Sequence, residues 1–237
     1  CTWPSPPLGV PSELWGMRNG NYGALGQGNT TTYSSPVQVG ALTDWAIVAS
    51  STHGLAVKTD RSLWSWGKNQ FGALGNGNTT NTSSPVQIGA LTTWATVGSN
   101  QYHSAAIKND GTLWAWGYNA KGQLGQGNTT NYSSPVQVGA LTNWLEVACS
   151  TYATMATKTD GTLWTIGDNV YGQLGDGSTT NRSSPVQVGA LTTWSKVAGT
   201  GMYCMALKTD GTIWGWGRNA SGGLGQGNTT DYSSPVQ

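Results

Sequence analysis

The residues that could do metal or acid–base chemistry are few in this sequence, and two of them are histidines. His53 and His103 lie 50 residues apart in closely similar surroundings. Two imidazoles on neighbouring structural units could share a metal ion, because neutral imidazole is a common metal ligand. The next two equivalent positions hold Ala153 and Tyr203, which interrupts any ring of such ligands. We therefore expect both histidines to be hydrogen-bonded structural residues, and we expect no metal site.

The carboxylates and hydroxyls also lack a catalytic arrangement. Glu13 and Glu146 are the two glutamates, and no pair of acids has a local spacing that suggests acid–base catalysis. No Gly-x-Ser-x-Gly sequence is present, and the Gly-Gln-Gly-Asn segments lack the lysine and the helix that a phosphate-binding loop needs. We expect no catalytic residue, no cofactor and a protein that is not an enzyme.

A period of about 50 residues organises the chain. Its clearest markers are a Leu-Gly pair, a Ser-Ser-Pro-Val-Gln segment and a lone Trp. The Leu-Gly pair falls at Leu25, Leu74, Leu124, Leu174 and Leu224. A fixed period of this length with Gly and Trp markers is typical of a propeller or a solenoid.

Each period contains four short segments that favour β-structure. In the third copy they read LWAWG, PVQV, WLEVA and TMATK. Asn109-Asp110-Gly111 separates two such segments, and an Asp-Gly between apolar runs is a strong hairpin signal. No stretch shows helical periodicity. Four strands per unit favour a β-propeller blade over the alternative, a β-solenoid.

The repeat resembles that of the regulator of chromosome condensation family. The resemblance rests on His-Ser/Gly-x-Ala-x-Lys-x-Asp-Gly-x-Leu-Trp-x-Trp-Gly-x-Asn-x-x-Gly-x-Leu-Gly, nearly complete from His103 to Gly125. It implies a β-propeller, typically with seven blades, and places the histidine in the structural consensus. The family includes nucleotide exchange factors, inhibitors, ubiquitin-ligase domains and bacterial or phage proteins, so the resemblance specifies the fold much better than the function.

The period divides the chain into a Pro-rich lead over residues 1–13 and a series of repeats. We expect an all-β fold with four full blades plus a half, as part of a seven-bladed ring. A longer chain, a second copy or a larger assembly would complete that ring, since an open propeller leaves an unpaired edge. The repeat units run over 14–62, 63–112, 113–162, 163–212 and, as a partial unit, 213–237.

The positions that differ between copies are the candidates for binding. They change size and charge while the framework stays the same, as expected of loops that form a recognition surface on a rigid ring. Drift at solvated loops is the alternative. The candidate residues are Lys68, Phe71, Tyr118, Lys121, Asp168, Tyr171 and Arg218, then Tyr132, Arg182 and Tyr232, then Tyr102 and Tyr152.

Composition limits the class of partner. The net charge is +1 and only 9% of the residues are charged, so binding to nucleic acid through phosphate neutralisation is not expected. No apolar run has the length of a membrane span. Cys149 and Cys204 occupy different repeat positions, which predicts small buried residues and not a disulfide framework.

We therefore expect a non-enzymatic structural or binding module that recognises a protein or a cell-surface glycan. Low charge, many Thr, Asn and Gly residues and near-identical copies resemble phage and bacterial surface members of the family. This resemblance predicts an extracellular or virion-surface protein, such as a fibre or adhesin component. The alternative is a regulator of another protein, either a guanine-nucleotide exchange factor or a secreted enzyme inhibitor. No insertion interrupts the period, and such an insertion is what the family's exchange factors use.

Overall fold

The computed structural model describes residues 12–237, and nearly all of its regular structure is β-strand. A two-stranded sheet of β1 (Trp15–Arg18) and β2 (Tyr33–Gln38), with the short 3-10 turn η1 (Asn21–Gly23) between them, precedes four four-stranded antiparallel sheets. The strands of these four sheets are β3 (Trp45–Ser50), β4 (His53–Lys58), β5 (Leu63–Gly67) and β6 (Thr82–Gln87), then β7 (Trp94–Ser99), β8 (His103–Lys108), β9 (Leu113–Gly117) and β10 (Tyr132–Gln137), then β11 (Trp144–Cys149), β12 (Ala153–Lys158), β13 (Leu163–Gly167) and β14 (Arg182–Gln187), then β15 (Trp194–Thr200), β16 (Tyr203–Lys208), β17 (Ile213–Gly217) and β18 (Tyr232–Val236).

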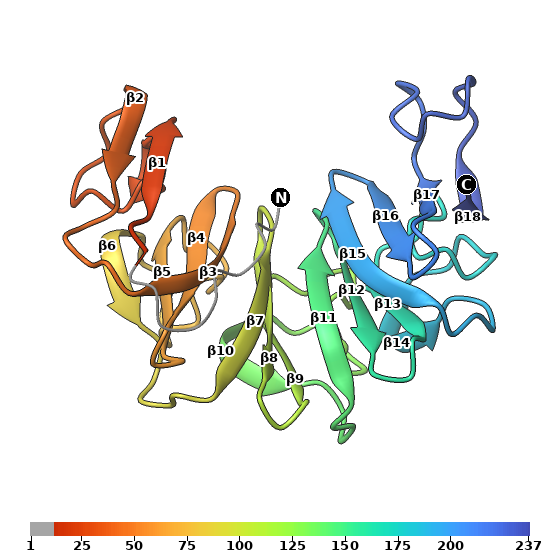
Figure 1. Ribbon diagram of the computed structural model, residues 1–237, viewed down its shortest axis with the longest axis horizontal. Coiled ribbons are helices and arrows are strands. Elements are labelled where there is room, and N and C mark those ends of the chain that lie inside the picture. The colour runs from red at the N-terminus through yellow and green to blue at the C-terminus, as the bar shows by residue number, and fades with distance from the viewer. Residues whose placement is uncertain (1–11) are drawn as a thin grey trace.

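The sheets stand one after another around an arc, as the blades of a β-propeller do (Figure 1). Strands β3, β7, β11 and β15 contact one another in that order, so the first strand of each blade lines the inside of the arc. The fourth strand is then the outermost. The arc is open between the β1–β2 sheet and the β15–β18 sheet (Figure 1). The predicted all-β propeller with four full blades and a smaller one is confirmed, while the number of blades in a closed ring stays a prediction.

The sheets are out of phase with the repeat units. Each sheet begins at the lone Trp of one unit and ends in the Ser-Ser-Pro-Val-Gln strand of the next unit. As a result, residues 213–237 supply β17 and β18 of a complete sheet, and the incomplete sheet is β1–β2 at the other end. A four-stranded repeat can be divided before any of its strands, because its period alone does not show which strands share a sheet.

The hydrophobic core lies between consecutive blades. One cluster joins Ala105, Ile107 and Leu113 of the second full blade to Val147 and Ala156 of the third. Leu113 is fully buried, and removing a leucine side chain from water contributes about 2 kcal/mol. Tryptophans at matched repeat positions are also buried in these clusters, among them Trp94, Trp116 and Trp144.

A tryptophan pair encloses a lysine beside the hairpin that joins the second and third strands of each full blade. In the second full blade, the Lys108 ammonium lies 3.7 Å from the centroid of Trp114 and 5.0 Å from that of Trp94. The Trp114 indole donates to Thr112 at 2.9 Å, and the Thr112 hydroxyl donates to Asp110 at 2.6 Å. These cation–π and hydrogen-bond contacts give the consensus Lys and Asp a structural role. The other three full blades repeat the arrangement.

The Gly-rich loop that follows the third strand fastens each blade to the next. In the loop after β9, the Asn119 side chain accepts from the Leu124 amide at 2.9 Å and donates to the Thr130 carbonyl at 2.9 Å. The Gly127 amide then donates to the Ser183 carbonyl of the outermost strand of the next blade at 2.7 Å. Among residues 12–237, no helix has the length and apolar character needed to cross a membrane.

Candidate binding surface

The two histidines lie inside the blade interfaces. His53 Nε2 is 2.8 Å from the Ser104 hydroxyl, which donates its proton to the Ala73 carbonyl. Nε2 must therefore carry a hydrogen and donate it to the Ser104 oxygen. His103 makes the same contact with Thr154 at 3.0 Å. Burial lowers the pKa of His53 to about 4, and that of His103 to about 3 with a smaller effect from His53. The predicted hydrogen-bonded histidines are thus confirmed.

The other reactive side chains are also engaged in the fold. Cys149 and Cys204 are free and buried, as predicted, and burial raises the pKa of each thiol to about 12. Such thiols are poor nucleophiles at neutral pH. Within residues 12–237, no group of three His, Cys, Asp or Glu side chains is arranged to hold a metal ion.

Strand register brings two of the predicted variable positions together in each blade. His103 pairs with Gly117 in the β8–β9 ladder, so the residue before β8 and the residue after β9 meet at the same end of the blade. The Tyr118 amide donates to the Tyr102 carbonyl at 3.0 Å. The next blade repeats this bond between Asp168 and the Tyr152 carbonyl at 2.9 Å. Variable residues that are 16 positions apart in the sequence, such as Tyr102 and Tyr118, therefore lie side by side on one surface.

Four aromatic side chains from consecutive repeats meet on this surface, and we call Phe71, Tyr102, Tyr118 and Tyr152 the aromatic cluster. The ring centroids of Phe71 and Tyr118 are 4.7 Å apart, and those of Tyr102 and Tyr152 are 5.6 Å apart and nearly parallel. Burial and then the neighbouring Tyr102 raise the pKa of Tyr152. All four side chains are half-buried, so the cluster is fixed by its own contacts yet remains open to a partner.

Charged side chains flank the aromatic cluster on both sides. The Lys68 ammonium lies 5.2 Å from the Tyr22 ring and 5.5 Å from the Tyr102 ring. On the other side, the Arg218 guanidinium lies 5.0 Å from the Tyr171 ring. We call Lys68, Lys121, Asp168, Tyr171 and Arg218, together with Tyr22, the charged flank.

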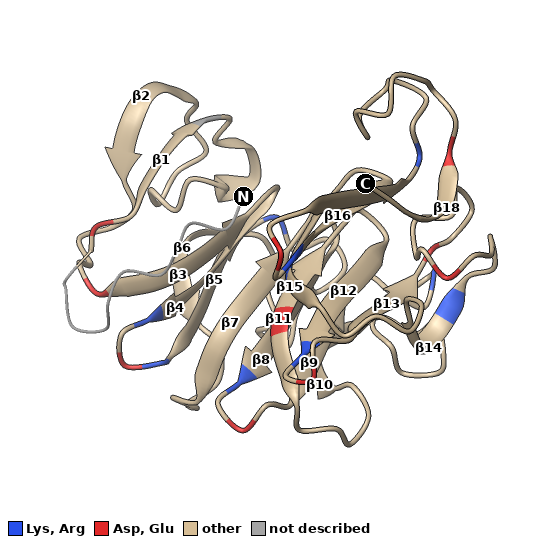
Figure 2. Cartoon of the chain, turned by 45° about the vertical axis from the view of Figure 1, so that its right-hand side comes forward, with Lys and Arg blue, Asp and Glu red and all other residues tan. Residues whose placement is uncertain are grey.

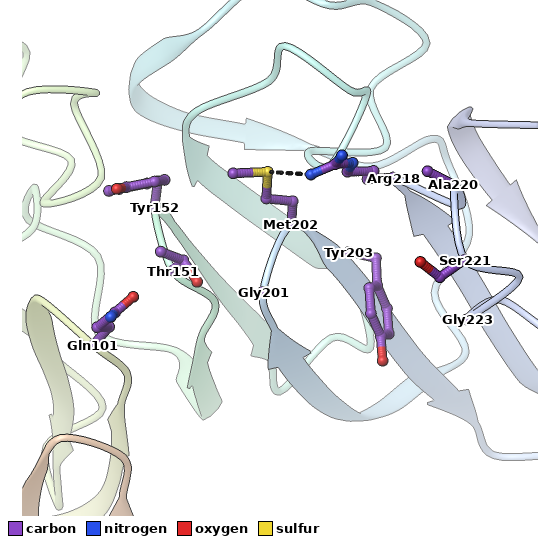
Figure 3. A pocket seen from close by; sticks show the side chains of 10 residues that line it. All are labelled: Gln101, Thr151, Tyr152, Gly201, Met202, Tyr203, Arg218, Ala220, Ser221 and Gly223. Atoms are coloured by element: carbon purple, nitrogen blue, oxygen red, sulfur yellow. Dashed lines mark hydrogen bonds between the residues drawn. The ribbon is translucent and has the colours of Figure 1, made fainter.

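A groove of about 480 Å³ continues the surface towards the last blade. Tyr152 is shared between this groove and the aromatic cluster, and Figure 3 shows Arg218 and Met202 along its upper side. The Arg218 side chain is 3.7 Å from the Met202 sulfur (Figure 3). Tyr203 and Ser221 lie on the opposite side from Gln101 and Thr151 (Figure 3). The groove thus combines two tyrosine rings, a thioether, a guanidinium and several hydroxyls.

A comparison with sequence models of protein families identifies the family. The sequence model of the RCC1-like domain matches residues 12–237, which is most of the chain. The chain belongs to the RCC1-like domain family. No curated protein matches its sequence.

Solved structures show the same fold at low identity. Human WBSCR16 is 22% identical with a TM-score of 0.83, over 94% of this chain and 61% of that protein. Yeast RCC1 (Prp20) bound to Kap60 is 21% identical with a TM-score of 0.78, over 96% of this chain and 57% of that protein. Prp20p from Saccharomyces cerevisiae, studied for its binding to Gsp1p and histones, is 20% identical with a TM-score of 0.79, over 97% and 60%. This RCC1-like chain therefore spans less than two thirds of the length of these proteins.

Three predicted binding residues of this RCC1-like chain take no part in the ring contacts of the aromatic cluster. Tyr132, Arg182 and Tyr232 begin the outermost strands β10, β14 and β18 and are not loop residues. The Tyr132 hydroxyl accepts from the Asn128 side chain at 3.3 Å, and Arg182 pairs with Asp176 at 3.0 Å. Each of these side chains contacts residues of its own blade, beside the Gly-rich loop. Their variation between copies is therefore explained by local packing.

Two residues of the surface were missed in the sequence. Tyr22 stands three residues before Leu25, as Phe71 stands three before Leu74, so the Leu-Gly marker could have identified it. The first copy has Met17 and Arg18 where the next copy has Trp66 and Gly67, and this departure from the repeat concealed the match. Tyr203 was considered only as an interruption in the series of histidines, although it lines the groove.

Proposed function

We propose that this RCC1-like propeller is a non-enzymatic protein-binding module that recognises its partner through the aromatic cluster and the charged flank. The observation that carries the proposal is the contact of Phe71, Tyr102, Tyr118 and Tyr152 across successive repeats. Tyrosine, arginine and methionine are the side chains enriched at the centres of protein interfaces. Rigid blades below them reduce the entropy lost on binding.

The comparisons support a protein partner more than a glycan. The yeast relatives are described with Kap60, Gsp1p and histones, all of which are proteins. A cell-surface glycan stays the alternative ligand, since tyrosine rings also stack on sugars. Regulation of another protein, including guanine-nucleotide exchange, is the second candidate function. An exchange assay over a panel of GTPases tests it, and unchanged nucleotide release on every GTPase would reject it.

We also propose that the chain acts outside the cell or on a virion surface, within an assembly that completes the ring. The low content of charged residues supports this setting, because 9% is well below the roughly 25% of ordinary soluble domains. Antibody labelling of intact cells or particles tests it. Labelling that requires permeabilised cells would contradict the proposed location.

The binding proposal is tested with a double substitution, Tyr102→Ala with Tyr118→Ala. We expect binding on protein arrays, measured against the unmodified chain, to fall by at least about tenfold, because each buried aromatic anchor contributes about 1–3 kcal/mol. Tyr132→Ala with Tyr232→Ala is the matched control, since both tyrosines begin outermost strands. Equal binding by the two double variants, with unchanged melting temperatures, would show that the aromatic cluster does not carry recognition.

A further inference from the structure

Charge is distributed unevenly between the binding surface and the rest of the molecule. The charged flank holds Lys68, Lys121 and Arg218, three of the eleven Lys and Arg residues, but only Asp168 of the ten Asp and Glu residues. Its net charge is therefore +2, although the whole chain carries +1. The rest of the chain carries a net charge of −1.

Elsewhere, charged side chains of opposite sign lie close to one another. The lysine that each tryptophan pair encloses stands two residues before the hairpin aspartate, as Lys108 does before Asp110. Figure 2 shows blue and red segments close together at these turns. Lys196 on β15 pairs with Glu146 on the neighbouring inner strand β11. Arg182 pairs with Asp176 on the outer side.

The single carboxylate of the charged flank does not neutralise its outer cations. Asp168 is 4% exposed, accepts from the Gln173 side chain at 2.7 Å, and lies 3.9 Å from the Lys121 ammonium. Neither Lys68 nor Arg218 forms an ion pair within residues 12–237. Both cations instead lie over tyrosine rings, which hold them in place without cancelling their charge.

The aromatic cluster lies between these two cations. A ligand that spans the surface meets a lysine, then the rings of the cluster, then an arginine at the groove. An anionic group gains charge-assisted hydrogen bonds at either end, and apolar groups cover the rings between them. A nucleic acid is a poor fit, because its affinity comes largely from neutralising several phosphates, and the charged flank offers three cations beside one carboxylate.

We infer that the partner presents an acidic polypeptide segment to this surface, with carboxylates at Lys68 and Arg218 and apolar side chains on the aromatic cluster. The inference rests on the proposed protein-binding function. Polypeptide is favoured over an anionic glycan because the rings pack against one another, tilted or edge-on in most pairs, and Met202 lines the groove. Flexible thioether and tyrosine contacts suit varied side chains.

The test uses a phage-displayed library of random peptides, selected on the full 237-residue chain. A second selection uses Lys68→Glu with Arg218→Glu, and a third uses Tyr102→Ala with Tyr118→Ala. Arg61→Glu with Lys196→Glu is the charge-matched control, because Arg61 lies at the opposite end of β5 and Lys196 lies on β15. The selected peptides are then synthesised and their affinities measured at low and high salt.

We expect the unmodified chain and the control to select peptides rich in Asp and Glu beside aromatic or aliphatic residues. These peptides should bind Lys68→Glu with Arg218→Glu at least about tenfold more weakly, as expected when attraction becomes repulsion at two sites. Added salt should weaken binding to the unmodified chain and not to the charge-reversed variant.

Other results would distinguish a failure of the acidic-partner inference from a failure of the proposed protein-binding function. Peptides that need Tyr102 and Tyr118 but are neutral or basic would overturn the acidic partner and leave the binding function standing. Peptides that bind all variants equally, or no enriched peptide at all, would overturn both. Binding of polysialic acid or hyaluronan at the same residues, without peptide binding, would replace the polypeptide with an anionic glycan.

Discussion

Two buried histidines make the stability of this propeller depend on pH. Their folded pKa values, about 4 for His53 and about 3 for His103, lie below the ordinary value of 6.5. As the pH falls below 6.5, the unfolded chain takes up protons that the folded chain does not. The free energy of unfolding should therefore drop by about 2 kcal/mol per histidine between pH 7 and pH 5. Urea unfolding across this range measures the drop.

The control is His53→Ala with His103→Ala, since Ala153 occupies the same position in the third full blade. This variant should be less stable at pH 7 but should lose most of the dependence between pH 7 and pH 5. The hairpin aspartates do not interfere, because hydrogen bonds from Thr112 and its equivalents hold their pKa values below the ordinary value. A slope that persists in the variant would assign the pH dependence to other groups.

At the scale of the structural element, the loop after each third strand fits closely against the next blade. Gly122 has φ +81°, and a Cβ there would lie 2.6 Å from the Ser183 Cα. Gly222 has φ +70° at the equivalent position, but its nearest such neighbour is the Asn228 carbonyl at 3.9 Å. Both Gly122→Ala and Gly222→Ala should incur the left-handed strain of about 1–2 kcal/mol.

Only Gly122→Ala should also force two blades apart, which costs typically about 1–3 kcal/mol more. Thermal unfolding of the two variants measures this difference directly, because the residue type, the loop and the sign of φ are matched. Equal losses of stability would mean that the contact between the loop and Ser183 does not hold the blades together.

The strands could be predicted from the sequence, but their grouping into sheets could not. Asp110-Gly111 identified the β8–β9 hairpin because few residues other than Gly adopt positive φ. The connection from Gln137 to Trp144 is nearly as short, yet it crosses to a new blade. Both connections contain a glycine with positive φ, Gly111 in the hairpin and Gly139 in the crossing. The packing of residues such as Leu113 against the next sheet distinguishes them, and this packing is not visible in the local sequence.

The same limit applies to the binding surface. Tyr102 and Tyr118 were recognised as variable positions, but as members of separate groups. Their adjacency follows from the pairing of His103 with Gly117, a register that the repeat period does not contain. Tyr132 belonged to the same kind of variable set and pairs with Gly117 from the other side, but its side chain packs against the core cluster between blades. Variation identifies candidate positions, while register and side-chain packing together decide which of them share a surface.

At the scale of the whole molecule, the face of the β15–β18 sheet that points away from the β11–β14 sheet exposes apolar residues. The equivalent residues of the preceding blades are buried. Ile213 is 58% exposed, whereas Leu113 and Leu163 at equivalent positions are 0% exposed. A Cβ at Gly225 would meet nothing within 4 Å, whereas one at Gly175 would lie 2.8 Å from the Trp216 indole nitrogen. An exposed apolar face of this kind favours association. We therefore expect the sedimentation coefficient of a protein limited to these 237 residues to rise with concentration.

Ile213→Asp tests this expectation with little risk to folding. An exposed substitution changes stability by about 0.5 kcal/mol or less, whereas Leu113→Asp buries an unpaired carboxylate and should unfold the chain. Ile213→Asp should keep the melting temperature and remove the concentration dependence of sedimentation, because a charge on the face opposes its burial. An unmodified chain that stays monomeric at every concentration would contradict self-association through this face.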